Sequence, residues 1–192
     1  MITVSTSNEA YHHGSLREAL VAAGMAALEG REGKDVSLRE LARTVGVSPT
    51  AVYRHFPDKK ALADALATEG LKMLYDAQKA ASDAAGDGPG AFAATGRAYV
   101  RFALAHPALF RFMFTLGDPI LNRPENDQAQ ALLAANTLKI TGDKEKAERL
   151  ALQAWAIAHG IAMLMLDGRI PADDALIDRL IDQKSLFPSE NC

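Results

Sequence analysis

The chain has 192 residues, of which 48% are hydrophobic, and a net charge of −3. This length allows one large domain or a small domain followed by a larger one, and the composition is sufficient for a sizeable core. The single cysteine, Cys192, is the last residue, so an internal disulfide is excluded and a reducing compartment is expected. The first twenty residues lack a signal peptide, and no window approaches eighteen uninterrupted apolar residues. We therefore expect a cytoplasmic protein with no membrane contact.

Alanine is abundant and no run of alternating β-branched residues occurs, which favours an all-α fold. We predict nine helices and no strand. Residues 1–13 are polar, lack Lys and Arg, and are predicted to be a disordered arm. His12 and His13 have no third ligand near them in the sequence, so no metal site is expected.

The first helix is predicted to begin at Ser15 and to end before Gly30 or Gly33. Ser15 and Glu18 have the spacing of a capping box, in which each side chain binds a free backbone N–H of the first turn. The same pattern recurs at Ser37, so both helices are expected to begin in the same way.

The stretch 37–60 carries the strongest local signals. The helix that begins at Ser37 is expected to end at Gly46, because glycine takes the left-handed conformation without strain. Ser48 then caps a second short helix, which Pro57 ends, and a third helix follows directly. Two short helices joined by such a turn form a helix-turn-helix.

The spacing inside this stretch is specific. Ala42 is small and lies four residues before Gly46, so the two helices can approach closely. Val52 lies six residues after Gly46 and can fill the gap between them. The remaining members of this small core are expected to be Leu41, Val45 and Val47.

A helix-turn-helix places its second helix, here residues 48–55, in the major groove of DNA. Thr50 can hydrogen-bond to base edges or offer its methyl group to thymine, whereas Lys59 is suited to phosphate. The alternative is that the charged residues are an ordinary solvated face. The candidate DNA contacts are Ser37, Arg39, Ser48, Pro49, Thr50, Tyr53, Arg54, His55 and Lys59.

The charge balance permits a local basic face but does not require one. Residues 1–60 carry a net charge of +1 and residues 61–192 a net charge of −4. Because the arm at 1–13 has no basic residue, contacts in the minor groove are not expected.

The rest of the chain is predicted to be helical as well. Its clearest break is the segment Gly86–Gly90. We expect residues 14–60 to form a DNA-binding domain and residues 61–192 a domain for ligand binding and dimerisation. The helices predicted after Pro57 run from Asp58 to about Ala85, Phe92–Ala105, Pro107–Leu116, Asn126–Ile140, Lys144–Leu166 and Pro171–Ser185.

The helix Lys144–Leu166 is apolar around most of its circumference, which indicates burial on several sides. A stripe of mostly small residues runs along it and allows another helix to approach closely. We expect this stripe and the last helix to hold two copies together in a homodimer. The stripe consists of Ala147, Ala151, Ala154, Ala158, Ala162 and Met165.

A pocket for a small apolar ligand needs aromatic walls and a few polar groups. The alternative is that such residues at helical spacing are core, and that His159 is a buried histidine with its hydrogen bonds satisfied. Arg97 and Arg101, one turn apart, could hold an anionic group or face solvent. The candidate ligand contacts are Phe102, Phe110, Met113, Phe114, Trp155, His159 and Met163.

The first 70 residues or so resemble the TetR family of transcriptional regulators. The residues that carry the resemblance are the segments Ser37–Val45, Gly46–Ser48 and above all Tyr53–Lys59. The resemblance implies nine helices, of which the first three bind DNA, the remainder binds a small molecule and the last two form the dimer. The segment Trp155–Gly160 is also similar to a subgroup whose C-terminal domain is named for a Trp/His-Gly motif.

These observations predict a ligand-responsive repressor that binds a palindromic operator as a homodimer and is released by a small apolar effector. An enzyme is not expected, because the sequence lacks a glycine-rich phosphate loop, a metal-spaced cluster and a nucleophile elbow. For the same reasons no cofactor is expected. The alternative that remains is an architectural DNA-binding protein without an effector.

Overall fold

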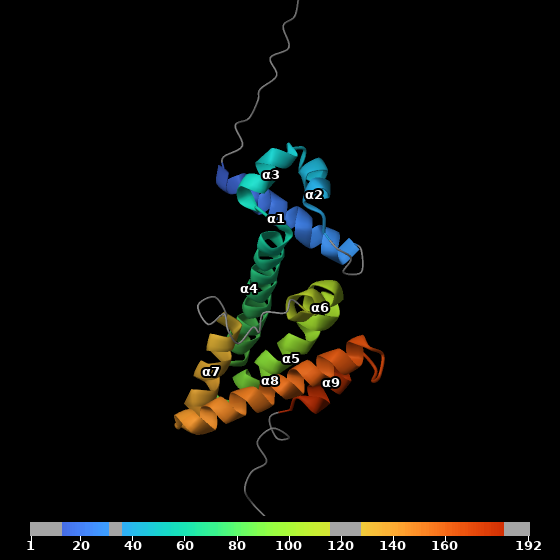
Figure 1. Ribbon diagram of the computed structural model, residues 1–192. Coiled ribbons are helices and arrows are strands. Elements are labelled where there is room, and N and C mark those ends of the chain that lie inside the picture. The colour runs from blue at the N-terminus through green and yellow to red at the C-terminus, as the bar shows by residue number, and fades with distance from the viewer. Residues whose placement is uncertain (1–12, 31–35, 116–127, 183–192) are drawn as a thin grey trace, which may run out of the picture. The chain divides into compact units, whose positions relative to one another are not determined.

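The computed structural model describes residues 13–30, 36–115 and 128–182. These residues form nine α-helices and no strand, which confirms the predicted fold class (Figure 1). The helices are α1 His13–Gly30, α2 Leu38–Val45, α3 Pro49–His55, α4 Lys59–Ala85, α5 Pro89–Ala105, α6 Pro107–Thr115, α7 Gln128–Thr141, α8 Lys144–Leu166 and α9 Asp174–Leu180.

The helix boundaries differ from the predictions at a few ends. α1 begins at His13, so Ser15 lies in its first turn and the predicted N-cap there is wrong. α5 begins three residues early, at Pro89, which occupies its first turn. α9 begins at Asp174 because the carboxylate of Asp173 accepts a hydrogen bond from the backbone N–H of Ala175 at 2.9 Å. The predicted arm at 1–13 lies almost entirely outside the described residues.

The chain divides into two compact units, Met1–Leu66 and Ala67–Cys192. In the first unit, α1, α2, α3 and the start of α4 enclose a small apolar core of Leu20, Leu41, Val52, Phe56 and Leu62. A Cβ placed on Gly24 would lie only 2.7 Å from Leu66 Cδ2. The glycine therefore lets α1 and α4 pack closely at this point.

In the second unit, α8 makes its most extensive contacts with α5 and α7. The small-residue stripe of α8 faces inward: Ala147, Ala158, Ala162 and Met165 are all at most 6% exposed. The prediction that this stripe holds a second copy is therefore wrong. It brings α8 close to helices of its own chain, as small residues at a helix contact do.

Ion pairs fix α9 against α5. Arg101 binds Asp174 at 2.7 Å and Asp178 at 2.9 Å, and Arg97 donates to the backbone oxygen of Ile181 at 2.9 Å. Both arginines, which the sequence left open as anion-binding candidates, therefore have partners within the protein.

The two serines at the starts of α2 and α3 provide a matched test of capping. The hydroxyl of Ser48 accepts from the N–H of Ala51 at 3.2 Å, whereas Ser37 makes no side-chain cap hydrogen bond, contrary to the predicted capping box. Ser48→Ala should lower the free energy of unfolding by about 1 kcal/mol. Ser37→Ala, the control, should cost less than half as much. Urea unfolding followed by circular dichroism measures both, and equal losses would contradict the assignment.

Candidate DNA-binding surface and ligand cavity

The turn between α2 and α3 has the geometry that the sequence predicted. Gly46 adopts the left-handed conformation, with φ 77° and ψ 31°, and its N–H donates to the backbone oxygen of Ala42. The N–H of Val47 donates to the same oxygen at 2.9 Å. Ala42 is 1% exposed and Val52 is fully buried, so the two helices meet through a small residue and a branched one.

One face of α3 is left open by this packing. Pro49, Thr50, Tyr53 and Arg54 are all exposed, and their positions i, i+1, i+4 and i+5 place them on one side of the helix. His55 is half-buried. The other candidate DNA contacts, Ser37, Arg39, Ser48 and Lys59, are exposed on α2 or at the starts of α3 and α4.

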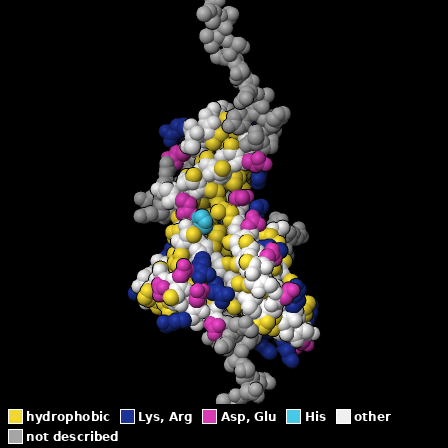
Figure 2. All heavy atoms as spheres, turned by 180° about the vertical axis from the view of Figure 1, so that it is seen from behind, with side chains coloured by type: hydrophobic (Ala, Val, Ile, Leu, Met, Phe, Trp, Pro, Cys, Tyr) yellow, Lys and Arg dark blue, Asp and Glu magenta, His cyan; other side chains and the backbone are white. Residues whose placement is uncertain are grey.

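Several charges near this face are balanced within the protein. Lys60 binds Asp64 at 2.9 Å, and the exposed side chain of Arg43 lies 3.9 Å from Glu40. Asp58 caps α4 by accepting from the N–H of Ala61 at 2.7 Å. On the face of the molecule seen in Figure 2, side chains of both signs are interspersed. Because the Lys60 and Arg43 pairs offset part of the positive charge near α3, the basic character of the candidate DNA surface is modest.

Within the first unit, Phe56 is 1% exposed and closes the core beneath α3. The guanidinium of Arg17 lies 5.4 Å from the centre of its ring, which is within the range of a cation–π contact. This contact attaches α1 to the segment that follows the predicted recognition helix, α3.

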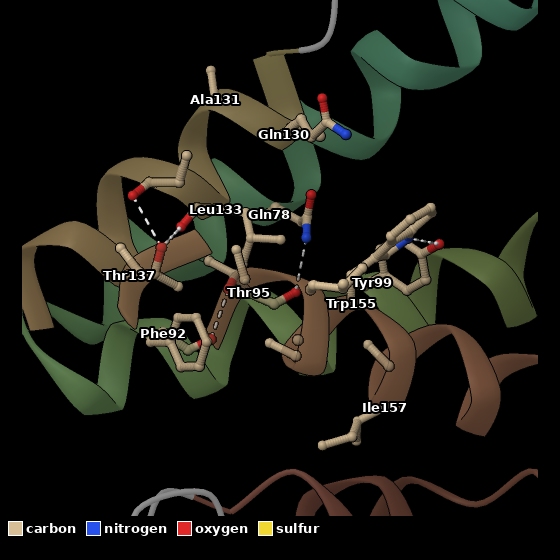
Figure 3. A pocket seen from close by; sticks show the side chains of 18 of the residues that line it. Gln78, Phe92, Thr95, Tyr99, Gln130, Ala131, Leu133, Thr137, Trp155 and Ile157 are labelled. Atoms are coloured by element: carbon tan, nitrogen blue, oxygen red, sulfur yellow. Dashed lines mark hydrogen bonds between the residues drawn. The ribbon is translucent and has the colours of Figure 1, made fainter. Parts of the chain in front are cut away.

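The second unit contains a cavity of about 650 Å³, which is large enough for a drug-sized molecule. Its walls come from α4, α5, α6, α7, α8 and Ile181, and they are mainly apolar (Figure 3). Leu71 and Leu74 of α4, Phe92 of α5 and Leu133 of α7 supply part of this lining.

Of the seven candidate ligand contacts, Phe114 and Trp155 line this cavity. Phe102, Phe110 and Met113 are at most 5% exposed and belong to the core. His159 and Met163 are half-buried and are not part of the cavity wall.

The sequence analysis did not identify Tyr99, which joins two of the candidates. The indole N–H of Trp155 donates to the Tyr99 hydroxyl oxygen at 3.3 Å, and that hydroxyl lies 3.0 Å from His159 Nδ1. Because the oxygen accepts from Trp155, the hydroxyl can donate its own proton to His159 Nδ1 when that nitrogen is unprotonated. Burial also lowers the pKa of His159, in agreement with a neutral imidazole.

The sequence analysis also did not identify three polar residues of the cavity. Gln78 Nε2 donates to the backbone oxygen of Thr95 at 3.3 Å (Figure 3). The hydroxyl of Thr95 donates to Phe92 O at 2.7 Å, and that of Thr137 lies 3.0 Å from Ala134 O. The available signal was Gln78 itself, a polar residue four positions after Leu74 on an otherwise apolar helix face.

Comparisons with known proteins agree with this architecture. Residues 17–66 match the model of bacterial regulatory proteins of the tetR family, and residues 92–184 match that of the tetracyclin repressor-like C-terminal domain. The chain is 26% identical over 163 residues to the uncharacterised HTH-type transcriptional regulator YobS of Bacillus subtilis (strain 168), covering 83% of this chain and 82% of that one.

Solved structures show the same similarity. A protein of unknown function from Rhodococcus sp. RHA1 is 33% identical, with a TM-score of 0.78 over 94% of this chain and 97% of that one. A tetR-family transcriptional regulator from Streptomyces coelicolor is 22% identical, with a TM-score of 0.67 over 89% of this chain and 79% of that one. The latter likeness concerns the fold alone.

The fold and the open helix-turn-helix define a DNA-binding regulator with a separate helical unit. The chain belongs to the TetR family of transcriptional regulators, which is a non-enzymatic family. Such a regulator works in the cytoplasm. The segment Trp155–Gly160 falls inside the matched C-terminal region.

The lowered pKa of His159 predicts a pH dependence of stability. In the unfolded chain the imidazole of His159 takes up a proton near pH 6.5, whereas in the folded protein it does so only at lower pH. The contribution of His159 to the free energy of unfolding is therefore fully present above about pH 6.5. It is lost as the pH falls from there through the pKa of His159 in the folded protein.

Urea unfolding on both sides of pH 6.5 tests this dependence. The wild type should lose more stability on acidification than His159→Gln, whose amide oxygen can still accept from Tyr99 but does not titrate. Equal losses in the two proteins would contradict the assignment.

Proposed function

We propose that this protein is a ligand-responsive repressor that binds a palindromic operator as a homodimer and releases it when a small apolar effector occupies the cavity. The observation that carries the proposal is a helix-turn-helix in the first unit together with an apolar cavity of about 650 Å³ in the second. The first unit would then be the DNA-binding domain, and the second the domain for ligand binding and dimerisation.

The cavity favours this function over an effector-independent DNA-binding protein, which has no use for one. Interiors normally pack without large voids, so an apolar space of this size indicates a binding site. The proposed repressor associates with the nucleoid through its operators.

A single helix, α4, belongs to both units. Its residues up to Leu66 lie in the first unit, and Leu71, Leu74 and Gln78 line the cavity in the second. An effector that moves this wall would act on a helix that begins directly after the recognition helix. Effector binding would shift the dimer toward a conformation in which the spacing of its two recognition helices no longer matches half-sites about 34–36 Å apart.

The outer face of α8 supports dimerisation through the last two helices. Leu164 of α8 and Leu180 of α9 are 45% and 39% exposed, and a Cβ on Gly160 would meet nothing within 4 Å. Leu152 and Ile157 of α8 are 59% and 42% exposed and also line the cavity. α8 is long and apolar enough to cross a membrane, and only 22% of its most apolar stretch is buried within the protein, so much of its apolar surface is left uncovered. A second copy packed on this face accounts for its composition without a membrane.

On DNA, the exposed face of α3 would enter the major groove. Thr50, which is exposed, would contact base edges. Tyr53 and His55 would donate to phosphates, as would Ser37, Arg39, Ser48 and Arg54. Lys59, which is exposed in the first turn of α4, would contact the phosphate backbone of the DNA.

A gel-shift series with fragmented DNA of the source genome, at several salt concentrations, tests operator binding. The proposal expects specific fragments to be retained and their affinity to fall as salt rises. No specific binding at any salt concentration would refute it.

Two substitutions distinguish contacts to the DNA phosphate backbone from recognition of the base sequence. Lys59→Ala should weaken binding to all sequences and reduce the salt slope by about 1, because one phosphate contact is lost. Thr50→Ala should instead change the preference among operator variants, at about 1–3 kcal/mol for the affected base pair. Fluorescence anisotropy with a set of operator variants measures both, and identical behaviour of the two proteins would show that the roles are wrongly assigned.

The dimer is tested by placing a charge on the exposed face of α8. Leu164→Glu would bury two like carboxylates at a symmetric contact, so the dimer dissociation constant should rise at least about tenfold. Leu138→Glu is the control, because Leu138 is similarly exposed but lies on α7. Light scattering over a concentration series gives both values. A stable Leu164→Glu dimer would exclude this face.

A further inference from the structure

Gln78, a residue of the cavity wall, carries a buried hydrogen-bond acceptor that has no partner among the described residues. Gln78 is 8% exposed, and among the described residues its Oε1 has no hydrogen-bond partner. The orientation of the amide is set by Thr95, whose backbone oxygen can only accept and therefore takes the Nε2 end. In Figure 3 the Gln78 oxygen points away from Thr95, toward the side on which Gln130 lies.

The neighbouring polar groups of the wall already have partners. The hydroxyls of Thr95 and Thr137 donate to backbone oxygens of their own helices. The Trp155 N–H donates to the Tyr99 hydroxyl, which is also hydrogen-bonded to His159 Nδ1. Within the described part of the wall, Gln78 Oε1 is thus a side-chain acceptor without a hydrogen bond, and an O–H or N–H group would satisfy it.

Of the described residues that line the cavity, the charged ones are a single exposed pair. Lys144 and Glu148 lie 3.9 Å apart, with side chains 89% and 69% exposed. They face water and balance each other. Among the described residues, the buried part of the wall offers neither a carboxylate for a cation nor a basic group for an anion. An isolated charge transferred there would lose its hydration without compensation.

We infer that the cavity takes a neutral, mainly apolar molecule with an O–H or N–H group that donates a hydrogen bond to Gln78 Oε1. This inference rests on the proposed function, in which the cavity is the effector site. Gln78 would determine specificity, since a ligand without the donor leaves a buried acceptor unsatisfied, whereas a negatively charged group would be repelled by it.

Three naphthalene derivatives of similar size test this inference by calorimetry with the full-length protein near neutral pH. 2-Naphthol carries an O–H donor, 2-methoxynaphthalene lacks it, and 2-naphthoate carries a negative charge. We expect 2-naphthol to bind about tenfold more tightly than the ether, and the anion to bind most weakly. Equal binding of naphthol and ether, tightest binding of the anion, or no binding of any of the three would overturn the inference, because the cavity has room for each.

Variants identify the acceptor. In Gln78→Leu, and in the unbranched Gln78→Met, the ratio of naphthol to ether affinity should fall to about one. Thr137→Val is the matched control, since it removes a hydroxyl from the same cavity whose proton is already used inside α7. Its affinity ratio should stay near that of the wild type. A ratio that persists in both Gln78 variants, or that collapses in Thr137→Val alone, would assign the contact to another residue.

The failure of this inference can be distinguished from that of the proposed function by adding operator DNA. If the ether binds as tightly as naphthol and still releases DNA, the cavity is an effector site and the role of Gln78 is wrong. If naphthol binds with the expected preference but leaves DNA binding unchanged, the ligand class stands and the repressor mechanism fails.

Discussion

The close packing of α8 on its own domain is the constraint on which the second unit depends. The inner face of α8 is lined by alanines, and Ala158 and Ala162 are buried where α8 packs on α5 and α7. Because these side chains are small, the helices approach closely, and larger groups are displaced to the two sides. His159 meets Tyr99, Phe110 and Phe114, and Trp155, one turn earlier on the same side of α8, reaches the cavity wall. The same packing turns the leucines of α8 outward, so one helix shapes both the cavity and the proposed dimer face.

The helix-turn-helix could be predicted almost completely from the sequence because its signals act within one turn of the chain. Gly46, Ser48 and Asp58 each satisfy a backbone group three or four residues away, so no distant segment decides their role. Capping boxes were predicted less well. Their spacing is local, but the hydroxyl caps only if the helix begins at that serine and the side chain turns inward. α1 begins before Ser15, and the hydroxyl of Ser37 makes no cap bond.

The cavity could be predicted only in part, because a periodic pattern shows that a face is apolar and not what covers it. Phe110 and Met113 belong to the core, whereas Phe114, one residue further along α6, reaches the cavity. The alanine stripe of α8 was ambiguous for the same reason, since a partner helix from the same chain or from another copy requires the same small residues. Gln78 and Thr137 were missed because each interrupts an apolar face, and only the tertiary structure distinguishes a polar cavity wall from a tolerated exception.

Trp155 has a consequence for the study of this protein in solution. It is the only tryptophan in the chain, it lines the cavity, and its indole N–H is bonded to Tyr99. The emission of an indole depends on the polarity around it and on its hydrogen bonding. The ultraviolet fluorescence of the unmodified protein therefore comes largely from one known place, beside the point where a ligand would lie. Trp155 fluorescence can therefore report whether the cavity is occupied, without an added label that could disturb the cavity wall.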